Sequence, residues 1–306
     1  PMVGEEQLQL LERLCNACAV SGDEGEVRAI VLEQVRPFVD DIKVDALGNV
    51  LATRAGQSEP RLRVMLAAHM DEVGLMITND EEDGIFRFDT VGGLDARQLA
   101  GKAVLVGKEH IPGVIGAKPI HLTTSDELER TISLETLRID VGPGNQDKVK
   151  PGDRATFATP FARLGPSLRA KALDNRLGVA TLIELIKHSP PEIDLQAAFT
   201  VQEEVGLVGA KALDDASIAG DLCLVLDADG SPGGIVIGAP THYTFTATFI
   251  GRASHAGVAP EKGISAVALA ASAVAQLPIG RIDECTTANV GTISGGTATN
   301  VIAARA

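Results

Sequence analysis

The stretch LRVMLAAHMDEVGLMIT, from Leu62 to Thr78, contains an apolar run with the composition of a buried β-strand. His69 and Asp71, spaced two residues apart, interrupt this run before it resumes. A nearly continuous apolar strand is typical of a sheet that is covered on both faces. The presence of an imidazole and a carboxylate at the end of such a strand raises the question of what they bind.

The whole chain has the composition of an ordinary globular protein. Its 306 residues are 45% apolar and 22% charged, enough for two or three domains. No run of about 18 apolar residues is present, and the N-terminal PMVGEEQLQLLERL lacks the features of a signal peptide, so we expect no membrane partner. The net charge of −14 argues against nucleic acid and anionic membranes. Because four cysteines make no disulfide framework, we expect a cytoplasmic location.

Cys15 and Cys18 form a C-x-x-C motif, which has two interpretations. In a redox protein this motif supplies a reactive pair of cysteines. Alternatively, both cysteines lie with Leu8 and Leu11 on one face of an N-terminal helix, where cysteine acts as a small hydrophobic residue. We favour the second interpretation, because this segment has amphipathic helical spacing.

Two local motifs lie between this helix and the apolar strand. The segment SGDE, residues 21–24, predicts a capping box that opens a second helix extending to about residue 36. The segment IKVDALGNVLATR, residues 42–54, predicts a β-hairpin whose turn is at Gly48 and Asn49.

The remaining pattern predicts an α/β host with an insertion. Between residues 73 and 163, short β-type runs alternate with glycine, proline and aspartate, which predicts an inserted β-barrel-like domain. The host, residues 1–72 and 164–240, continues with the helix KALDNRLGVATLIELIKH and the strands LQAAFTVQEE and DLCLVLDAD. Residues 241–306 predict an incomplete α+β lid domain, with the helix ISAVALAASAVAQL between the strands YTFTATFIGRASHAG and TTANVGTISGG.

Polar residues collect where the host strands end and where the host helix begins. They are His69, Asp71, Asp174, Asn175, Glu203, Glu204, Asp227 and Asp229. The carboxyl ends of strands in an open α/β sheet form a crevice that binds ligands. Several carboxylates cannot all stay ionised in one crevice without a cation. One imidazole with carboxylate oxygens suits zinc, manganese or cobalt, so the sequence predicts a metal site.

Each of these motifs alone has a simpler interpretation. The H-x-D pair is often a hydrogen-bonded surface pair, the segment EEVG is often a solvated loop, and Asp174 could be a helix N-cap. Their combined order, each beside an apolar strand or a helix entry, favours a metal site. The chain contains no G-x-S-x-G, H-E-x-x-H, Walker or G-x-G-x-x-G motif, which excludes the common alternatives.

Longer segments resemble two branches of one clan of metallopeptidases. AAHMDEVGLMIT, VGGLDARQLAGKAVLV, GVIGAKPIHL, KALDNRLGVA and QEEVGLVGA resemble the dinuclear metallo-aminopeptidases of the glutamyl-aminopeptidase and cellulase-M family, over about residues 5–215. Many members of that family assemble into tetrahedral shells. LDADGSPGGIVIGAP, GRASHAGVAPEKGISAVALAASAVAQL and GRIDECTTANVGTISGGTATNV resemble the lid of peptidase T-like tripeptidases, over about residues 195–306. We therefore expect a hybrid chain with a zinc-exopeptidase-type catalytic domain.

The resemblance implies roles for the clustered residues around two divalent metal ions, zinc or cobalt, with manganese as a third candidate. His69 and Asp227 correspond to terminal ligands of one metal. Asp174 corresponds to the carboxylate that bridges both metals, and Glu204 to a terminal ligand of the other. Asp229 is the alternative to Asp227, which we prefer because it directly follows the apolar strand.

The same resemblance implies catalytic and substrate-binding residues. Glu203 corresponds to the general base, and Asp71 to the carboxylate that fixes the tautomer of His69. His255 and Asn289 correspond to lid residues that contact substrate, although His255 could also be a locally hydrogen-bonded turn residue. The other histidines are interpreted as structural: His110, His121, His188 and His242.

The implied function is a metal-dependent exopeptidase that removes N-terminal residues from short peptides, as a homo-oligomer. The alternatives are an amidohydrolase of N-acyl amino acids and a metal-binding fragment without activity. Both related families place one more histidine ligand in a later segment, whereas this sequence ends at Ala306. We therefore expect the metal position at Glu204 to fill second, with His255 of a neighbouring subunit as a substitute ligand.

Overall fold

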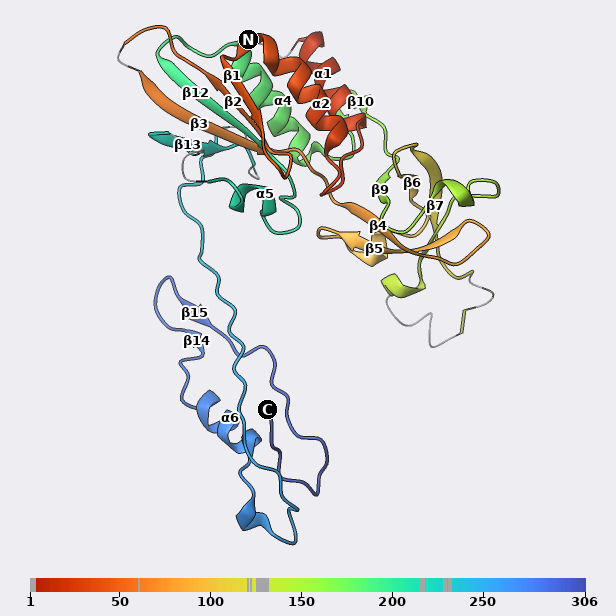
Figure 1. The fold of residues 1–306 in the computed structure, drawn as a ribbon, viewed down its shortest axis with the longest axis vertical. Coiled ribbons are helices and arrows are strands. Elements are labelled where there is room, and N and C mark those ends of the chain that lie inside the picture. Colours follow the sequence, from red (N-terminus) through yellow and green to blue (C-terminus); the bar gives the residue numbers. More distant parts are fainter. Residues whose placement is uncertain are drawn as a thin grey trace. The chain divides into compact units, whose positions relative to one another are not determined.

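The computed structural model describes residues 4–59, 61–119, 121, 123–124, 132–214, 218, 220–227, 230 and 233–306. The chain divides into two compact units, residues 1–234 and 235–306. The first unit contains an α/β sheet and a β-barrel, and the second contains one α-helix, a 3₁₀ helix and short strands (Figure 1). No helix in the described part is long and apolar enough to cross a membrane.

The α/β part is built on one mixed sheet with the strand order β1-β2-β12-β3-β13. Its strands are β1 (Asp41–Val44), β2 (Val50–Arg54), β3 (Leu62–His69), β12 (Ile193–Thr200) and β13 (Leu222–Val225). Strand β3 is parallel to both β12 and β13, whereas β2 is antiparallel to β1 and β12. This arrangement confirms the α/β fold class and the hairpin at Gly48 and Asn49.

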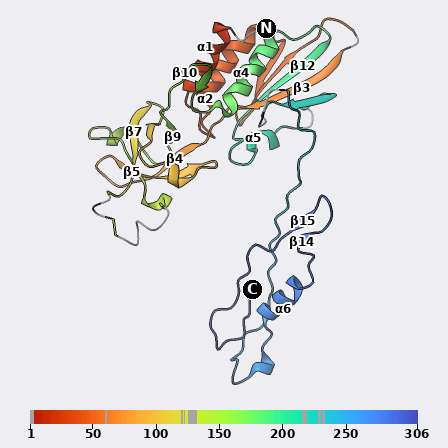
Figure 2. The ribbon, with the colours of Figure 1, turned by 180° about the vertical axis from the view of Figure 1, so that it is seen from behind.

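Helices α1 (Glu5–Asn16), α2 (Gly25–Val35) and α4 (Leu173–Lys187) cover one face of this sheet (Figures 1 and 2). Side chains alternate across strand β3, because successive residues of a strand point to opposite faces. Val64 and Leu66 pack with the helices, whereas Met65 belongs to a smaller apolar cluster with Leu51 and Ala198. Both faces of the β3 strand are therefore covered, as its apolar sequence predicts.

Two expectations for the N-terminal region are wrong. Helix α1 ends at Asn16, so Cys18 lies in the following loop instead of on the helix face with Cys15. The predicted capping box does not form, because helix α2 begins at Gly25 and its N-cap, Glu24, makes no side-chain capping bond. The hydroxyl of Ser21 instead donates to a distant carboxylate, so a tertiary contact replaces the local one.

The inserted segment forms the predicted β-barrel. Its strands close in the order β4-β5-β8-β7-β6-β9 around an apolar core that includes Leu75, Phe86 and Ile139. Closure leaves no unpaired edge strand. The strands are β4 (Gly74–Asp80), β5 (Ile85–Val91), β6 (Ala103–Val106), β7 (Ile111–Gly116), β8 (Arg138–Asp140) and β9 (Arg154–Phe157).

Short elements connect these parts. A hairpin of β10 (Ala162–Leu164) and β11 (Ser167–Arg169) leads from the barrel to α4, and helix α5 (Val208–Lys211) follows β12. The described 3₁₀ helices are η1 (Arg36–Phe38), η2 (Ala96–Gln98), η4 (Leu134–Thr136), η5 (Gln146–Lys148) and η7 (Pro260–Lys262).

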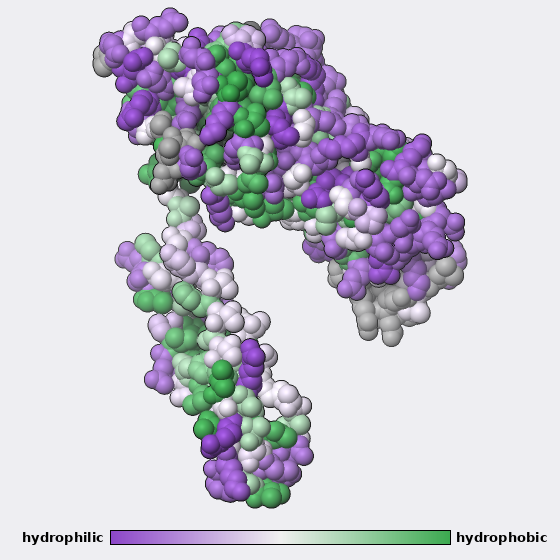
Figure 3. All heavy atoms as spheres, viewed as in Figure 1, coloured by the Kyte–Doolittle hydropathy of each residue, from purple (hydrophilic) through white to green (hydrophobic). Residues whose placement is uncertain are grey.

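The second unit contains the expected helix, α6 (Ala266–Val274), and a short hairpin of β14 (Gly280–Arg281) and β15 (Thr287–Ala288). The long strands expected near residues 243–257 and 286–296 are wrong, since the described pairing outside this hairpin consists of isolated bridges. Isolated strand pairs need further strands or a packed helix for stability. Within this described unit the buried apolar side chains are those of Ala266 and Ala270, and many apolar residues lie on its visible surface (Figure 3).

Candidate metal centre

His69 lies at the centre of a cluster of carboxylates at the carboxyl ends of the parallel strands. It ends strand β3, and its side chain is 2% exposed. Its Nε2 atom lies 3.2 Å from Asp174 Oδ1, 3.6 Å from Asp227 Oδ2 and 4.0 Å from Glu203 Oε2. Asp174 comes from the start of α4, Glu203 from the loop after β12 and Asp227 from the loop after β13. The structure thus brings together His69 and Asp174, which the sequence separates by 105 residues, and carboxylates from two further loops.

These side chains offer two overlapping sets of metal ligands. His69, Asp174 and Asp227 present ligand atoms within 4.8 Å of one another, and so do His69, Glu203 and Glu204. One imidazole and several carboxylate oxygens are ligands that zinc, cobalt or manganese accept. The donor set therefore fits a divalent metal ion of this type.

The electrostatics of the cluster also favour a cation. Burial raises the pKa of Glu203, and the neighbouring Asp227 carboxylate raises it further, against the opposing effect of His69. Burial and the Asp174 carboxylate likewise raise the pKa of Glu204. Each raised pKa means that the ionised carboxylate is disfavoured, because it is partly buried and lies close to other negative charges. A divalent cation between these groups would remove that penalty.

Asp71 is fully buried and contacts both His69 and the backbone of the two glutamates of the cluster. Its Oδ1 lies 3.3 Å from His69 Nδ1 and accepts the backbone N–H of Glu203 at 3.0 Å. Its Oδ2 accepts the Ser21 hydroxyl at 2.6 Å and the backbone N–H of Glu204 at 3.1 Å. Burial alone would raise the pKa of Asp71, but the nearby imidazole of His69 and the hydrogen bond from Ser21 outweigh it and lower that pKa. One carboxylate therefore positions the imidazole and the backbone of both glutamates.

The protonation of His69 follows from the same contacts. Burial opposes its positive charge, but the carboxylate of Asp71, and then those of Asp227 and Glu203, raise the pKa of His69 to about 9. In the metal-free protein the imidazole therefore carries a proton at neutral pH. A metal ion that binds Nε2 must displace this proton.

At the start of helix α4, the backbone of Asp174 does not have helical dihedral angles. The N-cap of this helix is Ala172, and Asp174 has φ −80° and ψ 107°, so the interpretation of Asp174 as an N-cap is wrong. The side chain of Asp174 is 74% exposed and available to a ligand, and the Asp174–Asn175 peptide bond is cis.

Further along α4, a Cβ atom at Gly178 would lie 2.4 Å from the Leu226 carbonyl oxygen. The absence of a side chain there allows the close approach of the segment that carries Asp227.

A buried charged network supports the cluster and was missed in the sequence. Lys171 Nζ lies 2.8 Å from Glu72 Oε1, and Arg176 Nη2 lies 3.3 Å from the same atom. Arg176 also donates to the backbone carbonyl of Asp71 at 3.1 Å. These contacts join α4 to the segment that follows β3. The motif KALDNR contains both Lys171 and Arg176. The start of an exposed helix could have the same sequence, so the motif alone does not predict this buried network.

The remaining predicted site residues lie elsewhere. In the second unit, His255 is exposed and its Nδ1 accepts the backbone N–H of Gly257 at 3.2 Å, and Asn289 is exposed. Their roles toward substrate stay predictions. Asp229 lies outside the described residues. Of the histidines interpreted as structural, His110 contacts Glu26 through its Nε2 atom, and the exposed ones are His121, His188 and His242.

Comparisons with known proteins agree with this architecture. The M42 glutamyl aminopeptidase family model matches residues 48–237, and a peptidase dimerisation domain matches residues 237–306. FrvX of Escherichia coli (strain K12) is 38% identical over 230 residues, which cover 72% of this chain and 64% of FrvX. The TET1 peptidase of Pyrococcus horikoshii, which can assemble into a tetrahedron or a large octahedral shell, is 36% identical with a TM-score of 0.64 over 76% of this chain and 73% of its own.

A further solved structure resembles the fold of the whole chain. Aminopeptidase PepT from Bacillus cereus ATCC 10987 matches 100% of this chain and 65% of its own, with a TM-score of 0.58 and 24% identity, a likeness of fold. The fold and the matched models define a peptidase-type α/β domain joined to a dimerisation domain, which confirms the expected hybrid. The chain belongs to the M42 glutamyl aminopeptidase family. It spans about two thirds of the length of such relatives.

Proposed function

We propose that this protein is a metal-dependent aminopeptidase that removes N-terminal residues from short peptides. The observation that carries the proposal is the convergence of Asp174, Glu203, Glu204 and Asp227 on the buried imidazole of His69. Membership of the M42 glutamyl aminopeptidase family supports the same reaction class. The peptide amide is an appropriate substrate for such a centre, since its hydrolysis needs an activated water and a polarised carbonyl.

The described residues can hold two divalent metal ions, zinc or cobalt with manganese as a third candidate. His69, Asp174 and Asp227 would hold one ion, and Asp174 and Glu204 would share in holding the other. Bound divalent ions supply Lewis acidity for the attacking water and for the scissile carbonyl. Asp71 keeps the Nε2 atom of His69 directed at the cluster, because its own Oδ1 lies beside Nδ1.

Glu203 is the general base in this proposal. Its side chain is 30% exposed, so water can reach it, and its raised pKa improves its ability to hold a proton. The Glu203 carboxylate would accept a proton from the attacking water and deliver it to the leaving amine. The Asp71 hydrogen bond to its backbone N–H keeps this side chain beside the ligands.

The roles of Glu203 and Asp174 can be separated by paired substitutions. With zinc or cobalt supplied, Glu203→Gln should lower the turnover of free dipeptides by about 10²–10⁴-fold and keep the metal content near that of the unsubstituted protein. Asp174→Asn should lower the metal content and the turnover together. Loss of metal in Glu203→Gln would show that Glu203 is a ligand, and retention of full metal in Asp174→Asn would contradict the two-metal proposal.

The substrate class has its own test. An aminopeptidase requires a free α-amine, whereas an amidohydrolase of N-acyl amino acids does not. We therefore expect free dipeptides to be cleaved and their N-acetylated counterparts to be left intact. The reverse preference would establish the amidohydrolase, and full metal binding without turnover of either series would leave a metal-binding protein without this activity.

We also propose that the protein is a homo-oligomer. The match of residues 237–306 to a peptidase dimerisation domain supports self-association. The second unit carries highly exposed apolar side chains, such as Ile237, Phe245 and Ile250, which are 97%, 87% and 80% exposed. Burial of such side chains against another copy of the chain would be favourable.

A further inference from the structure

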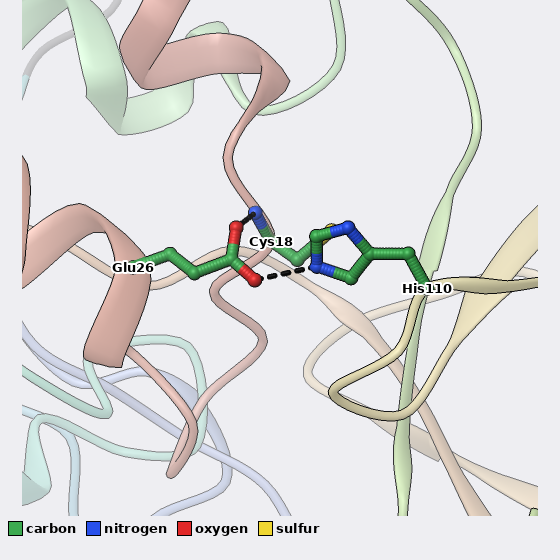
Figure 4. Close-up of side chains that lie close together, drawn as sticks. All are labelled: Cys18, Glu26 and His110. Atoms are coloured by element: carbon green, nitrogen blue, oxygen red, sulfur yellow. Dashed lines mark hydrogen bonds and ion pairs between the residues drawn. The ribbon is translucent and has the colours of Figure 1, made fainter.

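A second cluster of metal-binding side chains lies where the barrel meets the α/β part of the first unit. It consists of Cys18, Glu26 and His110, which point toward one another (Figure 4). Cys18 comes from the loop after α1, Glu26 from the first turn of α2, and His110 from the turn between strands β6 and β7 of the barrel. Their ligand atoms all lie within 4.8 Å of one another.

The contacts of this cluster place the Glu26 carboxylate between the other two residues. The backbone N–H of Cys18 donates to Glu26 Oε2 at 2.9 Å and fixes the orientation of the carboxylate. The other oxygen, Oε1, lies 2.5 Å from His110 Nε2. A cavity of ≈ 10 Å³, about the space of one water molecule, lies beside this contact. Cys18 and Glu26 line it together with Leu105 and Gly107 of the barrel, whereas His110 does not.

From this placement we propose that Cys18, Glu26 and His110 form a further metal site, which takes zinc or a similar divalent transition-metal ion and links the barrel to the α/β part. A sulfur, an imidazole nitrogen and a carboxylate oxygen are the three ligand types that zinc binds in proteins. The site is separate from the His69 cluster, since it shares no side chain with it. With three protein ligands, the fourth tetrahedral position is left to water.

Metal binding requires only a small movement of His110 relative to Glu26. Zinc–ligand bonds of about 2.0–2.1 Å in a tetrahedral site place a nitrogen and an oxygen ligand about 3.3 Å apart. The present 2.5 Å between His110 Nε2 and Glu26 Oε1 must therefore open by less than about 1 Å. The side chain of His110 is 39% exposed and can make this adjustment. Metal binding also displaces the thiol proton of Cys18, so a sulfur–metal bond forms as that proton leaves to solvent.

A metal ion at this position would strengthen the contact between the barrel and the α/β part, which exposed polar contacts stabilise only weakly. Lys108 of the barrel contacts Asp23, and Arg154 Nε donates to the backbone carbonyl of Ser21 at 3.1 Å. An exposed ion pair such as that of Lys108 and Asp23 contributes little stability. Three metal–ligand bonds from both sides of the boundary would fix the barrel beside the α/β part.

Cobalt(II) provides a probe that distinguishes the two sites. Cobalt bound to a thiolate absorbs in the near ultraviolet by charge transfer from sulfur, whereas the ligands around His69 contain no sulfur. Titration of the metal-free full chain with cobalt should therefore produce this band. Cys18→Ser should abolish the band and remove one bound cobalt. His110→Asn should weaken the affinity at this site by more than about tenfold. Asparagine also tolerates the left-handed backbone of this position, φ 51°.

Two controls complete the experiment. Cys285→Ser replaces an exposed cysteine outside the cluster and should leave the band unchanged. Asp174→Asn should lower cobalt binding at the His69 cluster and keep the band, so this site and the proposed catalytic centre are tested independently. Absence of the band in the unsubstituted protein, or its survival in Cys18→Ser, would overturn the proposal and leave the cluster as a hydrogen-bonded contact.

Discussion

Asp71 links more of the candidate centre than its position in the H-x-D motif indicates. Its two carboxylate oxygens contact the imidazole of His69, the hydroxyl of Ser21 and the backbone N–H groups of Glu203 and Glu204. A fully buried carboxylate is costly unless such partners surround it. The negative charge of Asp71 is therefore balanced by groups that the metal centre itself needs in fixed positions.

Asp71→Asn tests this role directly. The substitution keeps the shape of the side chain but removes its charge and places an amide NH₂ beside groups that donate hydrogen bonds. We expect the metal affinity of the His69 cluster to fall by about 10–100-fold, as is typical when a partner behind a ligating histidine is lost. Calorimetric titration with zinc would measure it. Ser21→Ala, which removes one donor only, should have a smaller effect, and an unchanged affinity in Asp71→Asn would contradict the proposed role.

The raised pKa of His69 predicts how the metal-free protein responds to pH. The pKa is raised from its ordinary value of 6.5 to about 9. The protonated imidazole therefore stabilises the folded state fully below pH 6.5, and this contribution is lost as the pH rises through about 9. A shift of this size corresponds to about 3 kcal/mol. Urea unfolding between pH 6 and 10 with a chelator should show the loss, and His69→Gln should lack it. Equal pH dependence in both proteins would show that His69 is not protonated at neutral pH.

At the scale of elements, the features that the sequence predicted correctly are those that depend on local patterns of residues. The apolar run of β3 and the six barrel strands follow from composition and turn residues, and the polar residues after each host strand predicted the cluster around His69. Ser21 was assigned to a capping box because its local pattern fits one, whereas in the fold Asp71 is the stronger partner. Cys18, Glu26 and His110 come from three elements, so no sequence spacing could have joined them.

Gly178 provides a prediction at the level of helix α4. A Cβ atom there would lie 2.0 Å from Asn175 Oδ1 and 2.4 Å from the Leu226 carbonyl oxygen. Gly178→Ala should therefore displace the segment that carries Asp227 and destabilise the protein by about 1–3 kcal/mol, although alanine favours a helix. Metal affinity should fall as well. Thr181→Ala, at an exposed position of the same helix, is the matched control for both measurements. Normal stability and metal affinity in Gly178→Ala would mean that this close approach is not needed.

At the scale of the whole molecule, the two units differ in how they bury apolar residues. The apolar clusters of the first unit fill both the α/β part and the barrel. In the described part of the second unit, Ala266 and Ala270 are the buried apolar residues, and larger side chains such as Phe245 remain exposed. A surface of this kind supports the proposed self-association, since exposed apolar patches are typical of protein–protein contacts. Because the net charge is −14, association of copies must overcome mutual repulsion, which salt reduces.

Phe245→Glu tests self-association through the second unit. Burial of a phenylalanine contributes about 1.5–3 kcal/mol, so its replacement should weaken association by about ten- to a hundredfold. Sedimentation equilibrium over a range of protein concentrations would measure the change, and the unsubstituted protein should associate more tightly as salt increases. Leu164→Glu is the matched control, because Leu164 is an exposed leucine of the first unit, 54% exposed. If Leu164→Glu weakens association and Phe245→Glu does not, the copies meet through the first unit instead.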